Sequence, residues 1–266
     1  MATSMNGWPA ITSASSPDLR TITIPGTKKR ITVQKDAAPL FAAFYADWEH
    51  RMPKRMKLEN GMIACWNYRA SRFNPKQLSN HASGTACDAL NDTVLPADGQ
   101  AHMTAEEKAI LDSILSEYVT DDGHRVLANG EWWNVPHKDG MHTELSQEWD
   151  RYAKRNTTLA DVKNVINRLG IDKDGNRAKQ KWDGIVPVYD NILYAEDHDV
   201  ANTAAWRLAC RLADLKFFSG TPINGVQKYP AKAVAEWQKS IGAKPTGIYG
   251  PKAHDGIFPG DQSNIA

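Results

Sequence analysis

The chain has 266 residues, with 32 Lys and Arg against 31 Asp and Glu, so its formal net charge is +1. This balance argues against a nucleic-acid-binding protein, because such proteins carry an excess of basic residues. Apolar residues make up 41% of the chain and charged residues 24%, as in ordinary globular proteins. The longest apolar stretch covers only residues 37–46, which is too short to cross a bilayer as a helix.

The first 150 residues predict short strands interspersed with helices. Apolar residues recur at a period of two where strands are expected and near 3.6 where helices are expected. Two cap signals support the helices: Asp36 as the N-cap of the first, and Thr104 with Glu107 as a capping box for the second. In chain order we expect two strands within Ile22–Val33, a helix over Asp36–Arg51, strands at Gly61–Tyr68 and Gly84–Leu90, a helix over Thr104–Tyr118, and strands at Glu131–Val135 and Met141–Leu145.

The rest of the chain predicts helices joined by polar loops. Helices are expected over Leu159–Leu169, over Asn202–Phe218 and within Pro230–Phe258. The expected fold class is α+β, with a small antiparallel sheet flanked by helices in an N-terminal domain over residues 1–150. A connection over 151–200 and a smaller helical domain over 201–266 follow.

The cysteines and the N-terminus indicate where the chain is made. Cys65, Cys87 and Cys210 are few and odd in number, and no two form a CxxC pair. We therefore expect no disulfide framework and synthesis in a reducing cytoplasm. The opening residues lack a charged segment and an apolar segment of the secretory type, so no signal peptide is expected.

Two segments carry the residue types of a metal centre. The first, SNHASGTACD, contains His81 and Asp88, and the second, KDGMHTE, contains Asp139, His142 and Glu144. Two imidazoles and one carboxylate form a mixed ligand set that suits Zn²⁺, and catalytic zinc sites leave a fourth position to water. If both segments are strands, alternation places Asp88 on one face of its strand, and His142 with Glu144 on one face of theirs.

These segments resemble the zinc D-alanyl-D-alanine carboxypeptidase (VanY-like) superfamily, specifically its phage endolysin branch. Blocks similar to phage members also occur as NGWP at 6–9, WNYRASR at 66–72 and EWW at 131–133, so the resemblance covers about residues 5–146. The family pattern S-x-H-x-x-G-x-A-x-D, followed far downstream by D-x-x-H, is matched at Ser79, His81, Gly84, Ala86, Asp88, Asp139 and His142.

The resemblance implies a role for each matched residue. His81, Asp88 and His142 would bind Zn²⁺, Asp139 would be the general base, and Arg69 would hold the scissile carbonyl or its oxyanion. Around them, Arg72 and Ser79 would contact substrate, Trp132 and Trp133 would form the wall of the cleft, and Glu144 would orient a histidine or contact substrate. Cys87 stands where the family has a small aliphatic residue, and we interpret it as buried packing.

The C-terminal stretch Ala233–Ile257 resembles the peptidoglycan-binding type 1 helical module. Trp237-Gln238 and the run TGIYGP at 246–251 match the module, whereas Ala253-His254 departs from it. Trp237 and Tyr249 are the candidate wall-binding residues, with core packing as the alternative for both.

Together the resemblances imply a phage endolysin that hydrolyses an amide bond in peptidoglycan stem peptides. An L-alanyl-D-glutamate-type endopeptidase is favoured, because lysis requires cutting cross-linked strands. A D-alanyl-D-alanine carboxypeptidase and a non-catalytic wall-binding protein are the alternatives, and the presence of Asp139 and Arg69 favours an enzyme. We expect peptidoglycan as partner, no nucleic acid or membrane, and a monomer that leaves the host cytoplasm to act on the wall.

Overall fold

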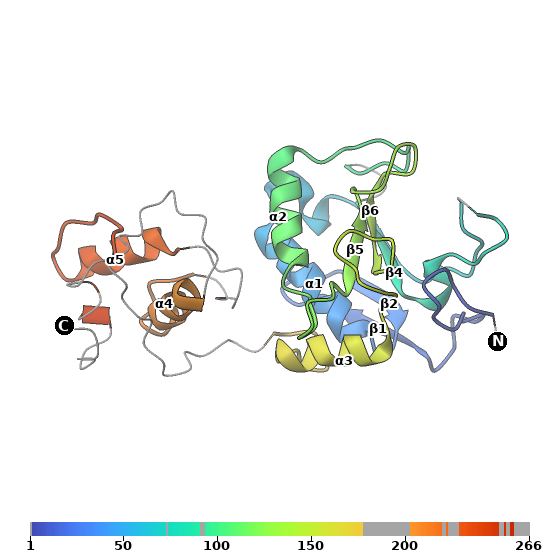
Figure 1. Ribbon diagram of the computed structural model, residues 1–266, viewed down its shortest axis with the longest axis horizontal. Coiled ribbons are helices and arrows are strands. Elements are labelled where there is room, and N and C mark those ends of the chain that lie inside the picture. Colours follow the sequence, from blue (N-terminus) through green and yellow to red (C-terminus); the bar gives the residue numbers. More distant parts are fainter. Residues whose placement is uncertain are drawn as a thin grey trace. The chain divides into compact units, whose positions relative to one another are not determined.

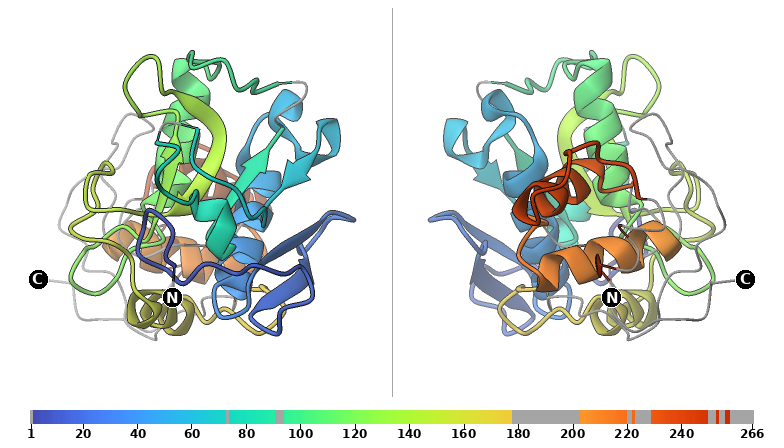
Figure 2. Two further views of the ribbon diagram at one scale, coloured as in Figure 1. Left: turned by 90° about the vertical axis from the view of Figure 1, so that its right-hand side faces the viewer. Right: turned by 90° about the vertical axis from the view of Figure 1, so that its left-hand side faces the viewer.

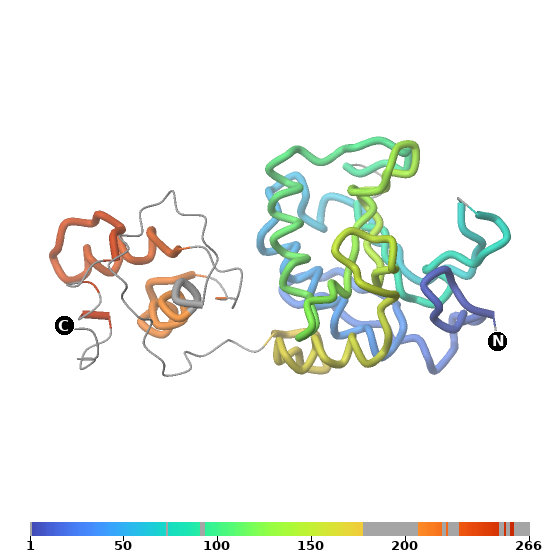
Figure 3. Tube along the Cα trace, in the orientation of Figure 1, coloured from blue at the N-terminus to red at the C-terminus, as the bar shows by residue number. Residues whose placement is uncertain are grey.

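The computed structural model divides the chain into two compact units, Met1–Ala178 and Lys179–Ala266 (Figure 1). It describes residues 2–72, 74–90, 94–177, 203–219, 222, 229–249, 253 and 256–257 (Figure 3). The fold is mixed, with two small antiparallel sheets and helices, as the expected α+β class requires. Among these residues, no helix combines the length and the apolar character needed to span a bilayer.

The first sheet is the two-stranded ribbon expected near the N-terminus. Strands β1 (Leu19–Thr23) and β2 (Arg30–Gln34) pair antiparallel around the Pro-Gly turn, with Ile22 opposite Ile31. Both isoleucines are buried, so one face of the ribbon packs on the core while the alternate residues face outward.

The second sheet has four strands in the order β3-β4-β6-β5, and all its neighbours are antiparallel. The strands are β3 (Ile63–Ala64), β4 (Ala86–Ala89), β5 (Leu127–Gly130) and β6 (Asp139–Leu145). The strand expected at Glu131–Val135 is wrong, because β5 ends at Gly130 and the chain turns there. A Cβ on Gly130 would lie 2.5 Å from the carbonyl oxygen of Asp139, so the close approach of these strands requires glycine.

Helix α1 (Ala38–Arg51) forms the centre of the first unit. Nine of its residues are buried, and it contacts the β1–β2 ribbon and two further helices. The expected N-cap is wrong: Ala37 occupies that position, and the side-chain oxygen of Gln34 accepts the backbone N–H groups of Asp36 and Ala37. Gln34, from the preceding strand, thus accepts hydrogen bonds from backbone N–H groups at the start of the helix, the role expected for the side chain of Asp36.

Two shorter helices begin with capping boxes. Helix α2 (Ala105–Leu115) has the predicted box between Thr104 and Glu107. Helix α3 (Leu159–Arg168) has one between Thr158 and Asp161, and is seen along its axis near the bottom of both views in Figure 2. The apolar face of α3 packs into the core of the first unit, so this unit extends beyond the expected boundary at residue 150. Three 3₁₀ turns, η1 (Lys54–Met56), η2 (Leu58–Asn60) and η3 (Asn80–Ser83), complete the unit.

The second unit contains α4 (Thr203–Asp214) and α5 (Ala231–Ser240), near two of the expected helices. Trp237 and Tyr249 are only 6% and 3% exposed and pack with the apolar residues of these helices. Both side chains thus pack in the core of this unit, which is the alternative to wall binding that the sequence left open. The structure describes no residue between 178 and 202, which includes most of the expected connection.

A buried glutamine explains why the matched C-terminal motifs occur together. The side-chain oxygen of Gln238 accepts the backbone N–H groups of Thr246 and Gly247, and its amide donates to the carbonyl of Ile248. Gln238 thus fixes the loop that carries Tyr249 against α5. The pairing of Trp237-Gln238 with the downstream TGIYG run has a structural cause within this unit.

Candidate metal centre

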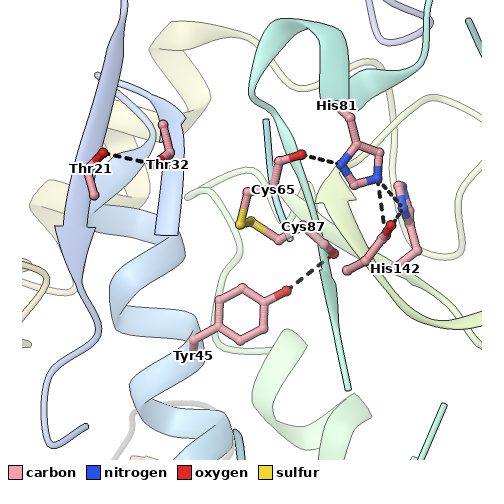
Figure 4. Close-up of a disulfide and its surroundings, with 8 residues drawn as sticks. Thr21, Thr32, Tyr45, Cys65, His81, Cys87 and His142 are labelled. Carbon is pink, nitrogen blue, oxygen red and sulfur yellow. Dashed lines mark hydrogen bonds and ion pairs between the residues drawn. A yellow bond between two sulfur atoms is a disulfide. The ribbon is translucent and has the colours of Figure 1, made fainter. Parts of the chain in front are cut away.

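Three side chains from distant parts of the first unit meet at one point. The shared oxygen of Asp88 lies 3.1 Å from Nε2 of His81 and 2.8 Å from Nδ1 of His142. The two imidazole nitrogens are 3.2 Å apart, and Figure 4 shows the rings of His81 and His142 close together. One ligand atom from each residue lies within 4.8 Å of the others, and all three residues are buried. A single metal ion could therefore contact all three.

The sheet register positions two of these ligands. Asp88 on β4 is directly opposite His142 on β6, and Ala86 is opposite Glu144. Residues opposite each other in an antiparallel pair share a face, so the alternation expected from the sequence holds. The small side chain of Ala86 leaves space beside Glu144. Asp139 is the first residue of β6 and not, as expected, part of the preceding loop.

The third ligand, His81, comes from η3. The Ser79 hydroxyl accepts the backbone N–H of His81, and Gly84 ends the turn in the left-handed conformation with φ 68°. A Cβ on Gly84 would lie 2.6 Å from the backbone nitrogen of Gln34, so no larger residue fits. The matched residues Ser79 and Gly84 thus fix the backbone conformation that places His81 in the cluster.

Each histidine is held by a second partner on the far side of its ring. Nδ1 of His81 lies 2.5 Å from the carbonyl oxygen of Cys65, and Nε2 of His142 lies 2.8 Å from Glu144. A carbonyl only accepts hydrogen bonds, so Nδ1 of His81 carries the hydrogen and Nε2 offers a lone pair to the cluster. Glu144 is itself held by the amides of Asn80 and Gln147. Such outer partners orient metal-binding histidines and raise their basicity.

The electrostatics of the cluster favour a bound positive charge. Burial alone raises the pKa of the Asp88 carboxyl, but the hydrogen bonds with His142 and His81 outweigh it and hold the pKa well below its usual range. Burial lowers the pKa of His142, yet its bonds to Asp88 and Glu144 raise that pKa well above the ordinary value. The carboxylates thus attract a cation, which a proton or a metal ion can supply.

Asp139 supplies an additional carboxylate close to the cluster. The residue is 9% exposed, and among the described residues its Oδ1 atom is buried without a hydrogen-bond partner. Burial raises the pKa of Asp139 above its usual value, against a smaller opposing effect of His142. An unpaired buried oxygen costs about 1–3 kcal/mol. The orphaned oxygen and the mixed imidazole–carboxylate set therefore fit a metal site with an additional polar ligand.

A cavity of about 690 Å³ opens beside the cluster. Its lining includes all the residues expected to contact substrate, whereas His81 and Asp88 are not part of that lining. Two guanidinium groups, of Arg69 and Arg72, face this cavity without an ion pair to any described residue. Burial lowers the pKa of Arg69. The predicted residues in the lining are Arg69, Arg72, Ser79, Trp132, Trp133, Asp139, His142 and Glu144.

The disulfide between Cys65 and Cys87 corrects the expectation that the cysteines would be unpaired. Ala64 is opposite Asp88 in the β3–β4 pair, so the next residues along, Cys65 and Cys87, also face each other. Their separation of 22 residues resembles no short cysteine motif, and only the strand pairing shows the contact. Cys87 is fully buried, as expected, but as half of a cross-link.

Sequence reasoning missed three further residues of the site. Asn80 could have been noticed, because it lies next to His81 within the matched motif. Asp150 and Trp149 follow the second motif with no recognisable signal and line the cavity. Burial, reinforced by the charge of Glu144, raises the pKa of Asp150 to about 7.

Comparison with known proteins adds no relative: no family model, no curated protein and no solved structure matches this chain. Function must therefore be inferred from the side chains of the site.

Proposed function

We propose that the protein is a zinc-dependent endolysin that hydrolyses an amide bond in the stem peptides of peptidoglycan. The observation that carries this proposal is the buried cluster of His81, Asp88 and His142 beside a cavity that also presents Asp139 and Arg69. Three protein ligands suit a catalytic zinc ion, which when bound would acidify a water molecule and polarise a carbonyl group.

Asp139 is the proposed general base. Its buried carboxylate takes a proton from the attacking water and passes it to the nitrogen of the leaving amine. A base works best when its pKa approaches the working pH, and burial moves the pKa of Asp139 in that direction. Because Oδ1 of Asp139 has no described protein partner, this atom is available for the transfer.

Arg69 and Arg72 are the proposed cationic contacts for substrate. As water attacks, negative charge develops on the carbonyl oxygen, and a fixed guanidinium in a partly buried site stabilises that charge. Arg69 is half-buried and serves this role. Arg72 adds a second cation in the same cavity, which suits a peptide that carries carboxylate groups, as stem peptides do.

Mass spectrometry of digested cell walls tests the proposal. The zinc-loaded full-length chain should release fragments with new amino and carboxyl ends within the stem peptide, and chelation should abolish their release. Fragments cut between L-alanine and D-glutamate identify the favoured endopeptidase, and loss of a terminal D-alanine identifies the carboxypeptidase. An unchanged wall digest would contradict the proposal.

The second unit is the proposed anchor on the insoluble wall. Its surface would have to make the contact, because Trp237 and Tyr249 are in its core. Holding the enzyme on the polymer raises the local concentration of scissile bonds. A chain ending at residue 178 retains α3 and should bind purified walls more weakly than the full chain; equal binding in a sedimentation assay would contradict an anchoring role.

A further inference from the structure

Trp149 presents a large apolar ring to solvent at the edge of the cavity. Its side chain belongs to the cavity lining, yet the residue is 55% exposed. The aromatic side chains of α1 are buried in the core, whereas Trp149 exposes its ring beside the candidate metal centre. An exposed apolar surface next to a polar cavity is typical of a binding site.

The ring of Trp149 is connected to the metal centre through Trp133. The ring centroids of Trp149 and Trp133 are 5.6 Å apart, and those of Trp133 and His142 are 5.2 Å apart. The indole N–H of Trp133 donates to Asp150 at 3.0 Å, and Asp150 also accepts the backbone N–H of Gln147. Trp133 is therefore fixed, and a ligand group resting on Trp149 would lie two ring-to-ring steps from His142.

A guanidinium group belongs to the same cavity lining as these rings. Arg151 lines the cavity, with its Cζ 5.8 Å from the ring centre of Trp132 and 4.7 Å from that of Tyr152. Among the described residues it forms no ion pair with a carboxylate. Tyr152, which holds it, has φ 66°, a left-handed conformation that bulky residues rarely adopt. The local backbone thus holds a hydrogen-bond donor in the cavity lining that also contains Trp149.

A pyranose ring matches this combination of groups. One face of a sugar ring is made of C–H groups that pack on an aromatic ring, while its hydroxyl and amide groups need polar partners at the edge. The guanidinium of Arg151 donates to the Tyr152 hydroxyl at 2.7 Å and has further N–H groups, to which an apolar side chain would add no polar contact. A sugar uses both the indole surface and these N–H groups.

We infer that Trp149, Trp133 and Arg151 form a saccharide subsite for the amino sugar that carries the stem peptide. This inference rests on the proposed function and sharpens it. An extended residue spans at most about 3.6 Å, so the lactyl group of the sugar and L-alanine together place the first peptide bond of the stem about 7 Å from the sugar ring. That span is comparable to the two ring-to-ring steps from His142 to Trp149. The bond between the fourth and fifth stem residues lies farther from the sugar, at about 14 Å or more. The subsite thus favours cleavage next to the sugar, between L-alanine and D-glutamate.

Two substrates and two variants test the subsite. The substrates are a muramoyl tripeptide, with the sugar, and the N-acetylated tripeptide of the same sequence without it. The variants are Trp149→Ala and, as control, Met62→Ala, which removes an equally exposed apolar side chain (58% exposed) outside the cavity lining. We expect the ratio of kcat/KM values, sugar-bearing over sugar-free, to fall about tenfold in Trp149→Ala and to stay at the wild-type value in Met62→Ala. An unchanged ratio in Trp149→Ala would overturn the inference.

Equilibrium binding to the metal-free protein separates the subsite from catalysis. Wild-type protein should bind the muramoyl tripeptide about tenfold more tightly than Trp149→Ala does in calorimetry, and equal affinities would overturn the subsite. If the zinc-loaded wild type hydrolyses neither substrate, the proposed function fails, and this binding comparison still decides whether the sugar is held.

Discussion

The two faces of strand β4 differ in what they contribute. Cys87 points into the apolar core, where it joins Cys65 and where its carbonyl accepts a hydrogen bond from Tyr45. The next residue, Asp88, lies on the opposite face and contacts His81 and His142. In a strand buried on both faces, a shift of one residue exchanges a core position for a polar one. The four residues of β4 thus contribute to both the core and the candidate metal centre.

The two faces meet at Cys65. Its sulfur is bonded to Cys87 on the core face, and its carbonyl oxygen holds the ring of His81 on the polar face. Changes on the core face should therefore affect the free energy of unfolding first and metal binding second. Changes on the polar face should affect chemistry first. The following variants test whether the two faces separate in this way.

The largest effect is expected from Asp139→Asn, which removes the proposed base but none of the three ligands. Turnover of a stem-peptide substrate should fall by about 10²–10⁴-fold, while the protein keeps its zinc. The unprotonated carboxylate is the active form and burial raises its pKa, so wild-type activity should fall on the acid side as pH drops through that raised pKa. The residual activity of the variant should not show this decrease at low pH. Wild-type turnover in the variant would remove Asp139 from the mechanism.

The core face is tested by the double variant Cys65→Ala with Cys87→Ala. A cross-link that closes a loop of 22 residues stabilises a protein by about 3 kcal/mol through the unfolded state. Urea unfolding should show a loss of about this size, with a smaller loss of zinc affinity through the carbonyl of Cys65. The control is Cys210→Ala in the second unit, which leaves the disulfide intact. A double variant as stable as the wild type would argue against the cross-link.

The polar face is tested by Glu144→Gln. The glutamine keeps the shape but loses the charge that faces Nε2 of His142, so zinc affinity should fall by about 10–100-fold. Competition with a coloured chelator measures the affinity. Glu148→Gln, an exposed position four residues along the chain, is the matched control. Equal affinity in Glu144→Gln and wild type would show that Glu144 does not support the ligand.

Asp150→Asn should have the smallest effect, and it acts on stability. Burial raises the pKa of Asp150 to about 7, so at pH values between about 4 and 7 the folded protein holds a proton that the unfolded chain has released. The contribution of this group to stability therefore decreases as pH rises through that window. Urea unfolding at pH 5 and pH 8 should show this decrease in the wild type and a weaker one in the variant. The same pH dependence in both proteins would exclude Asp150 as its source.

The sequence was sufficient to predict those features of the fold and the site that depend on residues close together in the chain. Strand alternation predicted that Asp88 lies on one face, and His142 with Glu144 on one face, and the β4–β6 register joins these faces. The capping box at Thr104 was likewise predictable, because its contacts lie within one turn of helix.

The remaining features depend on contacts between distant residues. Gln34 from β2 replaces Asp36 at the start of α1, and Cys65 reaches Cys87 only because β3 and β4 pair. Whether an aromatic ring is exposed also depends on distant residues. Trp149 and Trp237 both have polar neighbours in the sequence, but tertiary packing leaves Trp149 exposed and buries Trp237 in a core.

The most direct test is the zinc content of the purified chain after loading and exhaustive dialysis, measured by inductively coupled plasma mass spectrometry. The wild type should retain one zinc ion per chain, and His142→Ala should retain none. His50→Ala, which removes an exposed histidine outside the cluster, should retain one like the wild type. A wild type that loses its zinc, or a His142→Ala protein that keeps it, would contradict the metal centre on which the proposed function depends.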